Sequence, residues 1–200
     1  MKKVLLSLGV ALLTAVGAQA QVGYGVKAGL NFPKLNYSGG NVSYTTSAAT
    51  NFYLSGYASI PAATNFAIQP GVSLQGKGGK VEVGSLTTTR NLMSIEIPVN
   101  AVYYIPTGAT GSVFVAAGPY VGFNVSGKDK AGDVKTDIKF GSKDDQLKVV
   151  DYGVNFQLGY KLSNGLLING GYGLGLGNMS NVDALKIKNN VFSVGIGFEI

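Results

Sequence analysis

The 200-residue chain contains no cysteine, no tryptophan and no histidine. Without cysteine it cannot form disulfides, ligate metals through thiolates or use a thiol nucleophile. Without histidine it lacks the usual general base and a Ser-His-Asp triad. Charged residues make up only 13% of the chain, and no concentrated basic stripe of the kind that binds nucleic acid is present. These absences predict a non-enzymatic protein with no catalytic residue, cofactor, metal site or nucleic-acid partner.

The sequence also lacks a long uninterrupted apolar run, so no transmembrane helix is expected. Its N-terminal segment instead has the three parts of a signal peptide. Lys2 and Lys3 form the basic part, residues 4–16 form a short apolar stretch, and Ala18-Gln19-Ala20 is a small-residue cleavage site. We therefore expect a signal peptide at residues 1–20 and one exported domain at residues 21–200.

What the chain does contain is abundant glycine, 30 residues in all, and a repeated two-residue alternation. In residues 192–200, large apolar side chains alternate with small or polar ones. Because successive side chains of a strand point to opposite faces, this pattern predicts strands with one apolar face. Eight segments show it: residues 22–32, 51–60, 65–75, 92–105, 112–125, 149–161, 166–176 and 192–200.

The connections between these segments alternate in length. Those at residues 61–64, 106–111 and 162–165 are short, and the four others (residues 33–50, 76–91, 126–148 and 177–191) are long. Short periplasmic turns and long extracellular loops are typical of outer-membrane barrels. The sequence therefore predicts an all-β fold: an eight-stranded antiparallel up-and-down transmembrane β-barrel, monomeric and surrounded by lipid in a Gram-negative type of outer membrane.

Two of the long loops have distinctive sequences. Gly76-Lys77-Gly78-Gly79-Lys80 lacks the spacing of a phosphate-binding loop, so we interpret it as a plain glycine-rich loop. After the turn-like Lys130-Ala131-Gly132-Asp133, residues 134–140 again alternate. We expect the fifth and sixth strands to continue there as a hairpin above the membrane, which either offers a strand edge to a partner protein or merely covers the barrel.

Aromatic residues on the apolar face are expected to form two girdles at the membrane interfaces. Phe32 lies eight residues after Tyr24, a spacing that corresponds to about 20 Å across the membrane after strand tilt. The girdle near the short turns comprises Tyr24, Phe66, Tyr103, Tyr160 and Phe198, and the girdle near the long loops comprises Phe32, Phe52, Phe123, Tyr152 and Phe192.

The opposite faces of the strands carry the polar residues that should point into the lumen. The interior of an eight-stranded barrel is just wide enough for side chains to fill. Charges there must be paired, and Lys27 with Glu96 is the preferred pair. Such a lumen is either a plug of salt bridges or an ion path. The expected polar network contains Lys27, Glu96, Asp151, Lys161 and Glu199.

Several blocks of sequence resemble the PorT-like outer-membrane β-barrel family. They begin with Gly25-Val26-Lys27-Ala28-Gly29-Leu30-Asn31-Phe32 and include Ile95-Glu96-Ile97-Pro98-Val99 and Ala116-Ala117-Gly118-Pro119-Tyr120-Val121-Gly122. The resemblance extends in order over nearly all of the exported domain. It implies an eight-stranded barrel similar in architecture to the OmpA and OmpX barrels, and it implies little about activity.

The leading hypothesis is a non-enzymatic integral outer-membrane protein with a structural or surface-interaction role through its extracellular loops, where another protein or a surface could bind. One alternative is a narrow channel for ions or small solutes. A second is a soluble, lipocalin-like binder of a hydrophobic ligand, in which the apolar faces would have to point inward.

Overall fold

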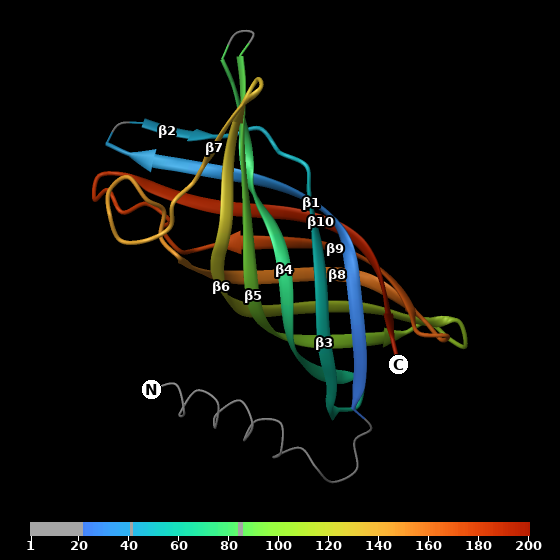
Figure 1. Ribbon diagram of the computed structural model, residues 1–200. Coiled ribbons are helices and arrows are strands. Elements are labelled where there is room, and N and C mark those ends of the chain that lie inside the picture. The colour runs from blue at the N-terminus through green and yellow to red at the C-terminus, as the bar shows by residue number, and fades with distance from the viewer. Residues whose placement is uncertain (1–21, 41, 84–85) are drawn as a thin grey trace.

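The computed structural model describes residues 22–40, 42–83 and 86–200, and the expected signal peptide at residues 1–20 lies outside them. The described strands form one antiparallel sheet that closes into a ring, because β1 pairs with β10 as well as with β3 (Figure 1). Eight strands build this ring, as predicted, and the short β2 and β7 are attached to β1 and β6. The elements are β1 (Gly23–Gly39), β2 (Val42–Thr45), β3 (Asn51–Ala63), β4 (Phe66–Val83), β5 (Leu86–Pro106), β6 (Gly111–Ala131), β7 (Val134–Asp137), β8 (Val150–Leu162), β9 (Leu166–Gly175) and β10 (Lys186–Glu199).

Short turns join β3 to β4, β5 to β6 and β8 to β9 at one end of the ring. In the first turn Asn65 adopts a φ of 61°, a left-handed conformation that asparagine tolerates well. In the third, Gly165 has a φ of 91° and the Asn164 Oδ1 accepts a hydrogen bond from the Leu166 amide at 3.1 Å. Asn164-Gly165 therefore forms a tight hairpin turn, the conformation that this dipeptide favours between two strands. Among the described residues, no helix is long and apolar enough to cross a membrane.

At the other end of the ring five strands, β1, β4, β5, β6 and β10, extend further than predicted. β4 runs to Val83 and β5 starts at Leu86, so the expected loop at residues 76–91 is wrong and is replaced by a strand hairpin. The loops expected at residues 33–50 and 177–191 also lose residues to β1, β2 and β10. The glycine, proline and asparagine residues of these segments suggested loops. In the structure the backbone polar groups of these segments are satisfied by strand pairing instead, and β1 and β10 remain in register out to Ser38.

The hairpin expected above the membrane is present in part. β6 extends to Ala131, the chain turns at Gly132 with a φ of 58°, and β7 returns antiparallel beside β6. The returning strand ends at Asp137, however, and does not continue into β8. In Figure 1, β7 and the hairpin of β4 and β5 extend beyond the ring.

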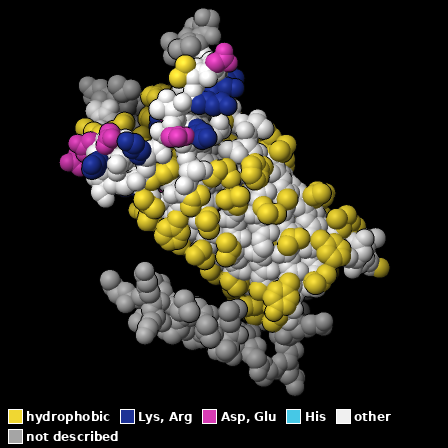
Figure 2. Space-filling model, viewed as in Figure 1, with side chains coloured by type: hydrophobic (Ala, Val, Ile, Leu, Met, Phe, Trp, Pro, Cys, Tyr) yellow, Lys and Arg dark blue, Asp and Glu magenta, His cyan; other side chains and the backbone are white. Residues whose placement is uncertain are grey.

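The ring is apolar outside and polar inside, the reverse of a water-soluble protein. On β1, the outward residues Tyr24 and Val26 are 61% and 59% exposed, whereas the inward residues Lys27 and Asn31 are 7% and 0% exposed. Figure 2 shows apolar side chains spread over the visible wall and the charged ones gathered at the loop end. The soluble lipocalin-like alternative, which requires the opposite arrangement, is therefore wrong.

The strand register groups the aromatic residues near both ends of this wall. Phe32 lies opposite Phe192, with ring centroids 6.2 Å apart, and Phe66 lies opposite Tyr103. Tyr172 on β9, also opposite Phe192, joins the loop-end group although it was not predicted. That these groups meet the two membrane interfaces stays a prediction.

Candidate functional site

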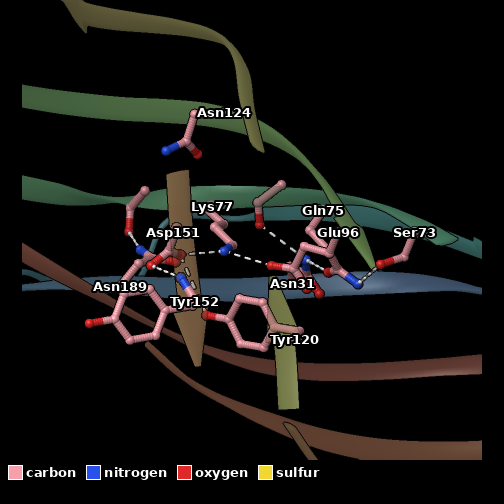
Figure 3. Close-up of polar contacts among 12 residues, drawn as sticks. Asn31, Ser73, Gln75, Lys77, Glu96, Tyr120, Asn124, Asp151, Tyr152 and Asn189 are labelled. Carbon is pink, nitrogen blue, oxygen red and sulfur yellow. Dashed lines mark hydrogen bonds and ion pairs between the residues drawn. The ribbon is translucent and has the colours of Figure 1, made fainter. Parts of the chain in front are cut away.

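The centre of the lumen holds a buried cluster of three charges. The Lys77 ammonium on β4 lies between two carboxylates, 2.6 Å from the Glu96 Oε1 on β5 and 2.7 Å from the Asp151 Oδ2 on β8 (Figure 3). The Lys77 side chain is 2% exposed and that of Asp151 is inaccessible. We call Lys77, Glu96 and Asp151 the central cluster, and it ties three separate strands together across the lumen.

Local sequence explains how a lysine reaches this position. Ser73, Gln75 and Lys77 are spaced two residues apart on β4, so all three side chains share its inward face. The next residue, Gly78, has a φ of 127°, and a side chain there would lie only 1.9 Å from the Arg90 carbonyl oxygen. Glycine therefore lets β4 and β5 stay close together at the position where the lysine turns inward.

Polar side chains complete the surroundings of the central cluster (Figure 3). The Lys77 ammonium lies 4.7 Å from the centre of the Tyr120 ring, whose hydroxyl donates to the Asp151 Oδ2 at 3.4 Å. The Asn31 amide donates to the Gln75 side chain at 2.8 Å and to the Gly76 carbonyl at 3.0 Å. The Tyr120 contacts restrain Lys77 and Asp151 directly, and the Asn31 hydrogen bonds order the polar layer beside the cluster.

A second polar group lies closer to the short turns. The Glu199 carboxylate forms an ion pair with Lys161 and accepts a hydrogen bond from the Tyr57 hydroxyl at 2.9 Å. Lys27 donates to the Gln157 side chain at 3.0 Å, and its ammonium lies 4.5 Å from the centre of the Tyr57 ring. In the described part of the lumen, three lysines therefore balance three carboxylates.

Above the central cluster, at the loop end, apolar side chains close the lumen. They bring together β1, β5, β10 and the segments around residues 138–147 and 177–185, and we call this cluster the roof. Its buried members are Leu35, Leu92, Leu147, Met179 and Ile187, with Tyr37, Ile138, Phe140 and Leu185 packed against them.

The roof is held by hydrogen bonds between two loops. The Asn181 amide nitrogen lies 2.9–3.0 Å from the carbonyl oxygens of Gly141, Lys143 and Gln146. The Lys148 amide also donates to the Met179 carbonyl at 2.9 Å. One asparagine thus connects the segment before β8 to the segment before β10.

Replacing Asn181 with alanine is expected to loosen this connection. Loss of net hydrogen bonding worth about 1.4 kcal/mol should make local opening about tenfold more frequent. Trypsin should then cut after Lys139 or Lys143 about tenfold faster while the ring stays folded. Asp183→Ala, an exposed change in the same loop, is the control and should leave the cleavage rate unchanged. Equal rates for the two variants would show that Asn181 does not hold the roof.

Little free space remains inside the ring. A cavity of about 70 Å³ lies among the polar residues of the middle, bordered by Lys27, Asn31 and Glu96. A wider hollow of about 590 Å³ opens at the short-turn end, with Lys161, Tyr104 and Glu199 in its lining. The lumen is therefore open toward the short turns and blocked by the central cluster and the roof.

The structure places all five residues of the expected polar network in the lumen, but it does not join them as expected. Glu96 pairs with Lys77 and not with Lys27, so the preferred Lys27–Glu96 pair is a wrong assignment. Lys77 was missed because its glycine neighbours suggested a loop. The signal that could have found it was the uninterrupted two-residue spacing from Ser73 to Lys77. In the described residues no group of three metal-ligand side chains occurs.

The remaining charges of the described residues all lie at the loop end. Outside the lumen the described residues include eleven lysines and arginines and seven acids, and none of these charges lies in the short turns. Some pair on the surface: the Arg90 guanidinium donates to both Asp129 carboxylate oxygens, at 2.8 and 2.6 Å. The excess is positive, so the loop end is charged and basic, whereas the charges nearest the short turns are Lys161 and Glu199 in the hollow.

Several solved structures match the chain at low sequence identity and with TM-scores below 0.5. Ail, the attachment invasion locus protein of Yersinia pestis, is 11% identical, with a TM-score of 0.46 over 90% of this chain and 99% of Ail. Neisserial surface protein A is 13% identical, with a TM-score of 0.48 over 90% of this chain and 99% of that protein. The N-terminal β-barrel domain of Pseudomonas aeruginosa OprF is 10% identical, with a TM-score of 0.42 over 91% of this chain and all of that domain. No curated protein matches the chain significantly.

Residues 18–181 match the family model described as an outer membrane protein beta-barrel domain. This match covers most of the chain, and it agrees with the closed antiparallel ring, its apolar wall and its polar lumen. The chain therefore belongs to the outer membrane protein beta-barrel domain family.

Proposed function

We propose that this protein is a non-enzymatic outer-membrane barrel that acts through its loop-end surface, in a structural or surface-interaction role, and does not conduct solutes. The observation that carries the proposal is the blocked lumen: Lys77 bridges Glu96 and Asp151 beneath an apolar roof. An ion crossing the barrel would have to displace both layers. The absence of histidine from the whole chain further disfavours acid–base catalysis.

Bilayer recording tests this proposal against the narrow-channel alternative. The purified protein should show no steady conductance. Replacing Glu96 with leucine should lower the free energy of unfolding by about 1–3 kcal/mol, because Lys77 loses one charged partner but keeps Asp151. The variant should still be silent in the bilayer. A steady conductance gained through this single change would favour the channel and contradict the plug.

The orientation follows from the asymmetry of the ring: we propose that the basic loop end is extracellular and the short turns are periplasmic. The chain contains no cysteine, so a single introduced cysteine can be labelled without background. A membrane-impermeant maleimide should label Val134→Cys, on β7, in intact cells, and should label Ser163→Cys, in a short turn, only after the cells are broken. The reverse pattern would invert the proposed topology.

Three finer assignments belong to the same proposal. Residues 1–20 act as a signal peptide, supported by their composition and by a family match that begins at residue 18. The barrel is a monomer, an assignment supported by a ring that closes within one chain. The sequence blocks that resemble the PorT-like family support a close relationship between this chain and that family.

A further inference from the structure

Three lysines form an outward-facing row at the junction of β1 and β10. Side chains alternate along both strands: Leu35, Ile187 and Asn189 are buried inside, so Lys34, Lys186 and Lys188 point to the outer face. In the register, Lys34 lies opposite Asn190, and Lys188 and Lys186 lie opposite Asn36 and Ser38. We call these three lysines the lysine row.

The lysine row stands directly beyond the loop-end aromatic group. Phe32 and Phe192 lie opposite each other, and Lys34 is two residues further along β1. With about 3.3 Å per residue and a tilt near 40°, Lys34, Lys188 and Lys186 lie about 5, 10 and 15 Å above the two phenylalanines. This is the depth of lipid headgroups and of the sugars beyond them. Lysine stems can also extend along the wall and bring their ammonium groups to phosphate level.

No acid pairs with the lysine row: Asp183, three residues before Lys186, forms no ion pair with it, and the neighbouring strands place no acid beside it. β1, β2 and β9 contain no aspartate or glutamate, and the single acid of β10 is Glu199 at its opposite end. None of the three lysines forms an ion pair with a described residue. The lysines of the β6–β7 hairpin differ, since acids separate them and Lys128 lies 3.9 Å from Asp137. Three like charges without a counter-charge repel each other, and an external anion would relieve that repulsion.

We propose that Lys34, Lys186 and Lys188 bind the phosphates of a phosphorylated glycolipid in the outer leaflet. The inference rests on the proposed orientation, because only an extracellular loop end meets that leaflet. Neighbouring outward side chains of Asn36, Ser38 and Asn190 supply additional hydrogen-bond donors for phosphate or sugar oxygens. The spread of the three lysines over about 10 Å suits a headgroup that carries more than one phosphate.

The test compares Lys34→Gln/Lys186→Gln/Lys188→Gln with Lys130→Gln/Lys135→Gln/Lys139→Gln, which removes the same charge from the hairpin region. Each purified protein is titrated in neutral detergent with diphosphoryl lipid A, with the dephosphorylated lipid and with inorganic phosphate. Binding is followed as the rise in the temperature at which the folded gel band converts to the unfolded one. Each lysine near an anionic surface contributes about fivefold in affinity. The lysine-row variant should therefore need about 100-fold more lipid A than the wild type to reach the same rise in conversion temperature. The hairpin variant should respond like the wild type.

An equal response of both variants to lipid A would overturn the inference, as would a response to inorganic phosphate as large as that to the lipid. The heat-dependent band of each variant reports whether the barrel has folded. Failure of the proposed orientation would appear separately, in the labelling of Val134→Cys on intact cells. The two failures can therefore be told apart.

Discussion

Replacing Lys77 with methionine is expected to lower the free energy of unfolding by about 3–5 kcal/mol, the usual cost of leaving buried charges without their partner. The change removes the ammonium that lies 2.6 and 2.7 Å from two buried carboxylates and leaves Glu96 and Asp151 to repel each other. Because the central cluster joins β4, β5 and β8, its loss affects the whole ring. Unfolding in urea, followed by tyrosine fluorescence and by the heat-dependent shift of the gel band, measures the effect.

Lys80→Met is the matched control, since Lys80 lies on the same strand but pairs with Glu82 where both side chains are substantially exposed. Its cost should stay below about 1 kcal/mol. Adding Glu96→Gln and Asp151→Asn to Lys77→Met should recover most of the lost stability, because the neutral amides no longer repel each other. If Lys77→Met costs no more than Lys80→Met, the central cluster does not hold the barrel together.

The strand cores and the facing of their side chains were predictable from the sequence, because a two-residue alternation directly encodes one apolar and one polar face. The loop-end extensions were not. Residues such as Pro33 and Gly78 suggest loops locally, but long-range pairing and the apolar roof favour strands. The roof itself comes from segments that are far apart in the chain, so no local pattern marks it.

The wrong pairing of Lys27 with Glu96 has a related cause. Alternation shows that a side chain points inward, but not at which height in the lumen or toward which strand. Strand tilt makes each row of paired residues climb around a barrel, so residues of one row end up at different heights. Glu96 lies opposite Ser73 on the neighbouring strand, and Lys77, four residues further along β4, still reaches it diagonally inside the lumen.

Introducing arginine at Ile196 should lower the free energy of unfolding in lipid by about 2–4 kcal/mol, the cost of a cation at the bilayer midplane. Ile196 is 63% exposed and lies opposite Ala28, which is equally far along β1 from Tyr24 and Phe32. If the aromatic groups mark the two interfaces, this position is at mid-depth. Urea titration of the protein folded into phospholipid vesicles measures the cost.

Val134→Arg provides the comparison, because Val134 is 67% exposed on β7, beyond the ring, and faces water in the proposed orientation. Its effect should stay within about 0.5 kcal/mol. Phe192 lies at the edge of the apolar wall. The part of the stability loss that comes from burying the charge should therefore be smaller for Phe192→Arg than for Ile196→Arg, because the cost of a cation in lipid falls toward the interface. In the native protein a cation, Lys34, already lies just outside that edge, two residues beyond Phe32. A uniform effect of arginine at Ile196, Phe192 and Val134 would mean that the wall does not lie in lipid, whereas a graded effect would locate the membrane between the two aromatic groups.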